Sequence, residues 1–351
     1  MGSRTYSEFR NLVEQIYQDT GNAVAGTVEW DYWIEEGLKK FSTYRPHLVD
    51  VIFKLESRFG DDVTGTTDKL TDSVKAQFLA GDATDEKVVH NLSQNTYAVV
   101  LAQDSTSIFS ISKDIFSANE AYRIYNKRCT NNRQIFIGDF MPYMWIDSVE
   151  YPVGEKRNWK ELDDVIEIMV DQIPDSDSTL DRLPDVDVLV RFAVAHKISQ
   201  LVGLTGQVAT TTTAGATSLA SATMGAGTIE IGEEFHLENQ RFVYTVTTAT
   251  TIASNTATIS FFPGLDSDAS NTAEVLTFRK NTLRDQDEEI FGRLVAARAA
   301  MSDSRSFINT INIGGPGTWA DYMGWKRELY NEVINELGGS KPRSKRLYTR
   351  G

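Results

Sequence analysis

The chain has 351 residues, more than a single compact domain usually holds, so two or three folded units are expected. Hydrophobic residues make up 41% and charged residues 24%, which is ordinary for a globular protein, and no apolar run is long enough to cross a bilayer. The formal net charge of −14 argues against tight wrapping of nucleic acid, because affinity for a phosphate backbone comes from Lys and Arg, whereas an acidic wall would leave passing DNA free to slide.

A single cysteine, Cys129, excludes a disulfide within the chain and a cysteine-based metal site. Residues 1–6 lack the apolar core of a secretion signal, and Tyr6 stands where a myristoylation signal needs Ser or Thr. We therefore expect the protein to remain in the compartment where it is made and to owe its stability to packing and assembly.

Residues 1–62 are predicted to form a pair of amphipathic helices. Apolar side chains recur at helical spacing from Tyr6 to Tyr17, and Thr5 with Glu8 gives this first helix a capping box. The second helix ends before Arg45, and its apolar side carries Trp30, Trp33, Ile34, Leu38 and Phe41. Two such helices are expected to pack as a hairpin.

The hydrophobic period changes to two in residues 63–127, which predicts an inserted β-module of barrel or sandwich type. Residues 207–281 show the same succession of short strands, in a stretch where Arg241 is the one basic residue between Ile198 and Phe278. The strands expected are 96–101, 107–112 and 120–125 in the first module, and 242–247, 257–261 and 274–278 in the second. We expect the two to be diverged copies of one module.

Residues 128–206, between the modules, are predicted to form an antiparallel sheet that belongs to the surrounding fold. Its expected strands are 134–137, 146–153, 165–170 and 186–194. Helical spacing returns in residues 282–338, where one helix is expected before the linker 304–317 and one after it. The predicted fold class is therefore α+β, with a helical core, a small antiparallel sheet and two inserted all-β modules.

Residues 339–351 form a basic tail. Its basic residues are Lys341, Arg343, Lys345, Arg346 and Arg350, with Leu347 and Tyr348 among them and no acid. Removing these five positive charges from the net charge of −14 leaves −19 on the rest of the chain. A tail this polar cannot fold alone, so it either stays solvated or is ordered by an acidic partner or by DNA.

No catalytic, cofactor-binding or metal-binding residue is predicted. The histidines His47, His90, His196 and His236 are scattered over all the segments. The glycines of 314–317 precede a helix, but no lysine follows them as in a phosphate-binding loop, which favours a fixed turn. Four tryptophans could form a platform for nucleobases, although their helical spacing favours a core or a subunit interface: Trp30, Trp33, Trp319 and Trp325.

Several stretches together indicate a family. They are residues 6–22 with the second helix ending at 44–47, residues 146–154, residues 309–319 with the following helix and basic end, and the β-module from 214 to 278. These stretches resemble bacteriophage head-to-tail adaptors, the neck proteins whose ring lies under the portal of tailed phages. The two β-modules depart from the minimal form of such adaptors.

The resemblance implies a virion protein of the phage neck, made in the host cytoplasm and assembled into a ring of about twelve copies around a DNA channel. Its implied partners are the portal protein, a tail or stopper or nozzle protein, and genomic DNA that passes without sequence-specific binding. The helices with their tryptophans would pack between subunits, the basic tail would reach the portal or DNA, and the β-modules would project outward. No enzymatic activity, cofactor or membrane contact is expected.

Two alternatives remain open from the sequence. In the first, the β-modules bind a glycan or dock a fibre and the helices only mount them. In the second, the protein is a cell-wall hydrolase associated with the neck. The chain has 49 acidic residues, and a catalytic pair of glycosidase type among them can be neither identified nor excluded from the sequence.

Overall fold

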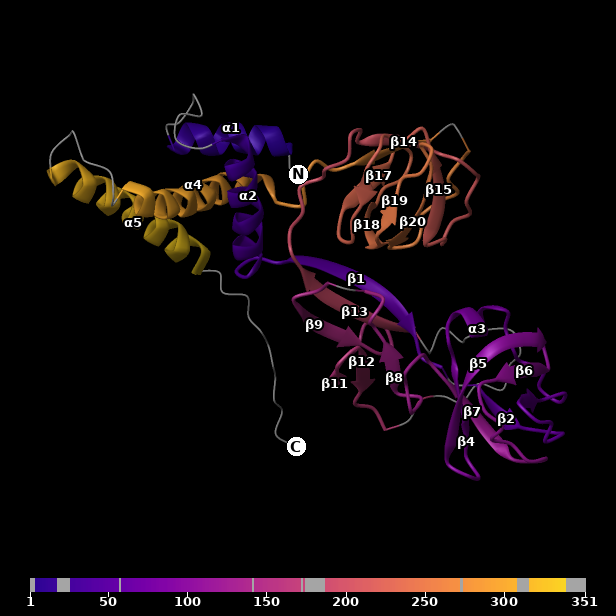
Figure 1. Cartoon of the computed structure of the whole chain (residues 1–351). Helices are drawn as coiled ribbons and strands as arrows, with labels where there is room; N and C mark the ends of the chain where they lie inside the picture. The colour runs from indigo at the N-terminus through magenta and orange to yellow at the C-terminus, as the bar shows by residue number, and fades with distance from the viewer. Residues whose placement is uncertain are drawn as a thin grey trace. The chain divides into compact units, whose positions relative to one another are not determined.

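The computed structural model describes residues 4–17, 26–56, 58–140, 142–171, 173, 187–271, 274–307 and 316–338, with side chains described except at 27 and 301–323. Within these ranges the chain is a mixed α+β protein in which strands hold more residues than helices (Figure 1). It divides into two compact units. Unit 1 comprises Met1–Val49, Pro142–Asp147 and Phe192–Gly351, and unit 2 comprises Asp50–Met141 and Ser148–Arg191.

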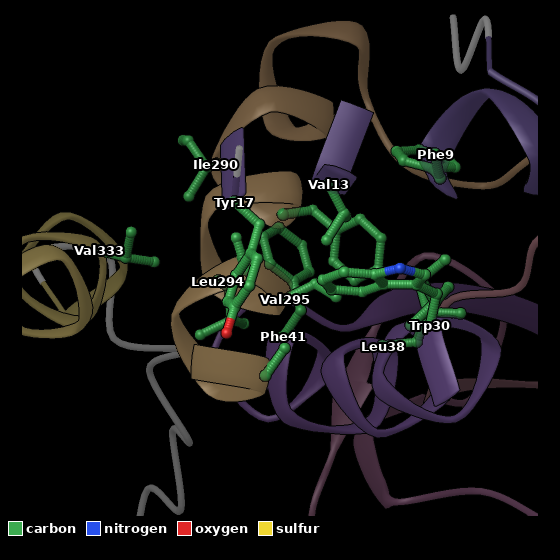
Figure 2. Packing of buried hydrophobic residues seen from close by; sticks show 14 of the residues in the cluster. Phe9, Val13, Tyr17, Trp30, Leu38, Phe41, Ile290, Leu294, Val295 and Val333 are labelled. Carbon is green, nitrogen blue, oxygen red and sulfur yellow. The ribbon is translucent and has the colours of Figure 1, made fainter. Parts of the chain in front are cut away.

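Four helices of unit 1, two from each end of the chain, share one hydrophobic core (Figures 1 and 2). They are α1 (Tyr6–Tyr17), α2 (Thr27–Ser42), α4 (Asp285–Phe307) and α5 (Pro316–Gly338). The expected capping box at the start of α1 is present, since the Thr5 amide donates to Glu8 Oε2 at 2.5 Å and the Glu8 amide donates to Thr5 Oγ1 at 3.3 Å. Helix α4 runs to Phe307, so its last four residues lie in the predicted linker.

Helix α4 lies against both N-terminal helices at close range. Its Phe291 ring meets Phe9 of α1 at 5.2 Å and Phe41 of α2 at 6.0 Å between ring centroids, both edge to face. Gly37 of α2 allows the approach, because a Cβ atom there would lie 2.5 Å from Val295 Cγ2. The predicted helix pair is therefore covered by a helix that is more than 240 residues away in sequence.

Gly37→Ala is expected to destabilise unit 1 even though alanine is the better helix former, because the added methyl group overlaps Val295 in a packed core. Gly324→Ala on α5 is the matched control, since nothing lies within 4 Å of the Cβ that it adds. We expect Gly324→Ala to raise the free energy of unfolding by up to about 1 kcal/mol and Gly37→Ala to lower it by about 1–3 kcal/mol. Chemical denaturation of both variants checks this, and equal effects would contradict it.

The first β-module, called module 1, is a six-stranded sheet in unit 2 with the order β2-β7-β4-β5-β6-β3. The short helix α3 (Gly81–Thr84) lies between its second and third strands in sequence. The strands are β2 (Phe59–Asp61), β3 (Lys69–Thr71), β4 (Val88–Asn91), β5 (Thr96–Ser105), β6 (Ile108–Ile111) and β7 (Ala121–Tyr125). The three strands predicted from the sequence correspond to β5, β6 and β7.

The second β-module, module 2, is a closed barrel in unit 1 with the order β14-β15-β20-β18-β17-β21 (Figure 1). A two-stranded sheet of β16 (Thr228–Ile229) and β19 (Thr250–Thr251) accompanies it. The barrel strands are β14 (Thr205–Val208), β15 (Ser218–Ala222), β17 (Glu234–Leu237), β18 (Val243–Thr248), β20 (Ala257–Phe262) and β21 (Val275–Phe278). The three predicted strands correspond to β18, β20 and β21.

Both modules follow one plan. The six strands of each module can be numbered one to six in chain order. The order of hydrogen-bonded neighbours across the sheet is then 1-6-3-4-5-2 in both modules. The fourth and fifth strands carry a bulge at the same place, at Leu101 in module 1 and Thr247 in module 2. The first strand places a buried glycine opposite the sixth strand in each, Gly60 and Gly206. Shared order, register and bulge support the expectation of two copies of one module.

The modules differ at the seam between the first and second strands. In module 2 these strands pair and close the barrel. In module 1 the carboxylate of Asp62 takes part in the seam, because its Oδ1 accepts a hydrogen bond of 2.6 Å from the Thr71 amide, and the Val63 amide donates to the Thr71 carbonyl at 2.7 Å. Asp62 is fully buried, so its side chain replaces part of a strand ladder.

The sheet predicted for residues 128–206 is two sheets. The first has the order β1-β13-β9-β10, and the second has the order β11-β12-β8. Their strands are β1 (His47–Lys54), β8 (Gln134–Phe136), β9 (Trp145–Glu150), β10 (Lys156–Arg157), β11 (Trp159–Leu162), β12 (Val165–Ile168) and β13 (Asp187–Val194). Strands β1 and β2 also lie within residues 1–62, which the sequence assigned to helices alone. Both faces of β1 carry apolar residues, such as Leu48 and Val49, so the alternation that identifies a strand is weak there.

Candidate interaction surfaces

Helix α2 presents an apolar face to solvent on the side away from the helical core. Val28 is 80% exposed and Tyr32 is 56% exposed, one turn apart. The Tyr32 ring meets the half-buried Trp33 ring edge to face at 5.1 Å. Large apolar side chains on a helix surface are typical of a protein interface, where aromatic residues supply much of the contact energy.

The four tryptophans predicted to pack between subunits do not share one environment. Trp30 is fully buried in the helical core of its own chain, edge to face with Tyr17 at 5.3 Å (Figure 2), so its assignment to subunit packing is wrong. Trp33 is half-buried and Trp325 of α5 is 41% exposed, so both can reach a neighbour. The side chain of Trp319 lies outside those described. The helical spacing predicted an apolar stripe but not which partner covers it.

The predicted tail site lies outside the described residues. It consists of Lys341, Arg343, Lys345, Arg346, Leu347, Tyr348 and Arg350.

Module 1 carries an exposed apolar row that sequence reasoning missed. Along β5, Tyr97, Val99 and Leu101 point outward and are 37%, 38% and 62% exposed, while Ala98 and Val100 between them are buried. When the two modules are aligned by their strand pairing and by the position of the bulge, this row corresponds to Val243, Thr245 and Thr247 of module 2. One copy of the module thus has an apolar outer row where the other has two threonines, and the comparison needs the strand register, which the sequence pattern does not supply.

Two of the scattered histidines meet in unit 1. The rings of His47 and His196 are 5.7 Å apart, and both are more than nine-tenths buried. His196 Nε2 lies 2.9 Å from the Arg45 carbonyl and its Nδ1 lies 2.9 Å from Thr282 Oγ1. His47 Nε2 lies 3.9 Å from Glu234 Oε1, and Arg279 forms an ion pair with the other oxygen of Glu234. The segments entering and leaving module 2 are therefore joined by polar contacts.

Burial lowers the pKa of His196 to about 3, with a further contribution from His47, and burial also lowers the pKa of His47. A histidine whose pKa is lower in the folded protein binds a proton more readily when the chain unfolds. The stability that these neutral rings contribute is complete above the unfolded pKa of 6.5 and falls as the pH drops toward 3.

Glu233, beside this pair in sequence, has the opposite effect. Burial raises the pKa of its carboxyl group to about 7, although hydrogen bonds from the Glu230 amide and Ser199 act against the rise. The folded state therefore favours the protonated acid. The resulting stability is present below the unfolded pKa of 4.5 and is lost as the pH rises to about 7. Between pH 5 and 7 the two effects oppose each other.

Glu233→Gln is expected to separate these effects, because glutamine keeps the shape of the acid and stays neutral at every pH. Relative to the wild type, the variant should gain about 2 kcal/mol more in unfolding free energy at pH 7 than at pH 5. Chemical denaturation of both proteins at the two pH values checks this. A constant difference between them would show that Glu233 is ionised in the folded protein.

Unit 2 contains a buried cluster of ion pairs. Arg58 donates to Glu56 through Nε at 2.9 Å and Nη2 at 2.7 Å, and to Asp82 through Nη1 at 2.8 Å and Nη2 at 2.7 Å. Lys87 Nζ lies 3.5 Å from Glu56 Oε2 and donates to Asn126 Oδ1 at 2.6 Å. All five residues of this cluster are at most 9% exposed: Glu56, Arg58, Asp82, Lys87 and Asn126.

In the described ranges, no three His, Cys, Asp or Glu side chains are grouped so that they could hold a metal ion. Among the same residues, no helix combines the length and apolar composition that crossing a bilayer requires. Comparison with protein-family models, curated proteins and solved structures gave no match to this chain.

Proposed function

We propose that this protein is a structural subunit of a bacteriophage neck, forming a ring that joins the portal to the tail and lets DNA pass. The observation that carries the proposal is the exposed apolar face of α2, with Val28 and Tyr32, on a helical core made from both ends of the chain. A ring of identical subunits needs such a surface on each copy, because its neighbours must bury it.

The charge of the chain supports the same function. With a net charge of −14, a ring of many copies would carry a large negative charge, and a channel lined by it would repel phosphate groups. DNA could then move through without binding. The function is geometric and electrostatic, with the helices packing between copies and the β-modules carried outside them.

Electron microscopy of the purified protein, alone and mixed with the portal of its phage, tests this proposal. We expect rings, either alone or once the portal is present. Tyr32→Glu should raise the protein concentration needed for ring formation at least tenfold, because it places a charge in the buried interface. Gln15→Glu makes the same change of charge at an exposed position of α1 and should leave the rings intact.

A monomer under both conditions, at every concentration tested, would overturn the proposal. Binding of the monomer to cell-surface polysaccharide would favour the glycan-binding alternative, and clearing of a cell-wall suspension would favour the hydrolase.

A further inference from the structure

Lys87 and Asn126 are neighbours across two paired strands of module 1. Strands β4 and β7 are antiparallel, with Val88 opposite Tyr125, so Lys87 and Asn126 form the next pair beyond the end of the ladder. Lys87 Nζ lies 2.6 Å from Asn126 Oδ1, and the two residues are only 4% and 9% exposed. A buried amine thus contacts a buried amide, and water has little access to either.

The amide of Asn126 is held in one orientation. Its Nδ2 donates to the Lys54 carbonyl at 2.9 Å and more weakly to the Gln134 carbonyl at 3.4 Å. Because these acceptors fix which end of the amide carries the nitrogen, Oδ1 and the adjacent carbonyl carbon face Lys87. Holding two reacting groups in contact replaces a collision in solution by an intramolecular step, which is a large part of the acceleration that folded proteins achieve.

A carboxylate able to accept the proton of the amine lies beside it. Glu56 Oε2 is 3.5 Å from Lys87 Nζ, and Glu56 is 2% exposed. Glu56 shares the Arg58 guanidinium with Asp82, which binds Arg58 through two hydrogen bonds of its own. If Glu56 is protonated, Arg58 therefore keeps a charged partner. The cluster can move a proton from Lys87 to Glu56 without leaving a buried arginine unpaired.

We propose that Lys87 and Asn126 join in an intramolecular isopeptide bond. Glu56 takes a proton from the Lys87 ammonium group, and the neutral Nζ attacks the carbonyl carbon of Asn126. The C–Nδ2 bond then breaks, Glu56 returns its proton to the departing nitrogen, and the second Nζ proton is passed on in the same way. The products are a secondary amide and an ammonium ion, which carries away the positive charge of Lys87, and no oxidant or reductant is involved.

The bond would tie the start of β4 to the segment that follows β7. Its position corresponds to Glu233 and Lys280 in module 2, a pair of side chains that cannot eliminate ammonia. Module 1, with its open seam, would thus carry a covalent link that the closed barrel of module 2 lacks. This inference does not depend on the proposed neck function.

Peptide mapping of the full-length wild-type protein tests the proposal. Trypsin cannot cut after an acylated Lys87, so we expect residues 76–113 joined to residues 124–127, with a mass lower than the sum of the two peptides by one ammonia, about 17 Da. Fragmentation must place the link on Lys87 and Asn126. The linked species should account for most of the protein after folding is complete.

Lys87→Arg keeps the positive charge but supplies no competent amine, so the linked peptide should disappear. Lys127→Arg is the matched control and should leave the link unchanged, because Lys127 is next to Asn126 in sequence but pairs with Glu86 at 2.9 Å. Glu56→Gln should slow the formation of the bond at least tenfold if the variant folds. The wild-type map decides the question even if Glu56→Gln does not fold.

Recovery of unmodified peptides 76–87, 88–113 and 124–127 in full amount from wild-type protein would overturn the proposal. So would a loss of ammonia confined to peptide 124–127, because that result indicates cyclisation of Asn126 on its own backbone.

Discussion

Replacing Arg58 by alanine should lower the free energy of unfolding of unit 2 by about 3–5 kcal/mol, because it leaves two carboxylates buried without the guanidinium group that both of them contact. Glu56 and Asp82 are 2% and 1% exposed, and Arg58 contacts each through two hydrogen bonds. Lys87 lies near Glu56 and, where its amine has not reacted, can compensate only one of the two charges. The variant must therefore protonate a carboxyl group or admit water to the cluster.

The state of Arg58 follows from the same contacts. Burial alone would lower the pKa of its guanidinium group, but the charges and hydrogen bonds of Glu56 and Asp82 raise it above its ordinary value. Arg58 also donates to the Gln77 carbonyl at 2.9 Å, so the loss of the side chain leaves a buried backbone acceptor as well. An unpaired buried acceptor of this kind costs about 1–3 kcal/mol.

Hydrogen exchange of the β4 and β7 amides measures this effect within unit 2, independently of unit 1. Protection of these amides should fall by at least a hundredfold in Arg58→Ala. Lys127→Ala is the control, since it removes a more exposed ion pair with Glu86 and should cost less than about 1 kcal/mol. Equal protection in the two variants would show that the cluster contributes no more than a surface pair.

The Arg58 cluster could not be predicted from the sequence. Glu56 and Asp82 are 26 residues apart, and charged residues occur throughout the chain, so no spacing distinguishes this pair from the others. The contact arises because the start of module 1 and the α3 segment are brought together by the sheet. His47 and His196 are a second example, since 149 residues separate two rings that meet in the fold.

Three strands of each module were predictable because their side chains alternate between a buried and a more exposed face. In β5, buried Ala98 and Val100 alternate with more exposed neighbours, and in β18 buried Tyr244 and Val246 do the same. The similarity of the modules was also visible, as a shared succession of strands. The closure of module 2 and the open seam at Asp62 depend on hydrogen bonds between residues distant in the chain, which alternation does not report.

The tryptophans show the corresponding limit for helices. An apolar stripe at helical spacing predicts that Trp30 packs against other apolar side chains, and Trp30 is fully buried. The same stripe cannot say whether the covering surface is another helix of the chain or another subunit, because helical periodicity records only that one face is apolar. Helix α4, which supplies that surface, lies beyond both β-modules in the sequence.

Phe291 is the side chain on which this arrangement depends most. It is fully buried in α4 and meets Phe9 of α1 and Phe41 of α2 edge to face (Figure 2 shows Phe9 and Phe41 with α4). Phe291→Ala should lower the free energy of unfolding of the helical core by about 3–5 kcal/mol, because it removes both ring contacts and leaves a cavity where three helices meet.

Phe291→Leu should cost less than Phe291→Ala, since leucine fills more of the space, and Val28→Ala should change stability by less than about 0.5 kcal/mol, since Val28 is 80% exposed. Chemical denaturation followed by tryptophan fluorescence measures the helical core, where Trp30 lies beside Tyr17. A loss of stability that increases from Val28→Ala through Phe291→Leu to Phe291→Ala is expected only if α4 packs on both N-terminal helices. A Phe291→Ala variant as stable as Val28→Ala would show that the two ends of the chain do not share a core.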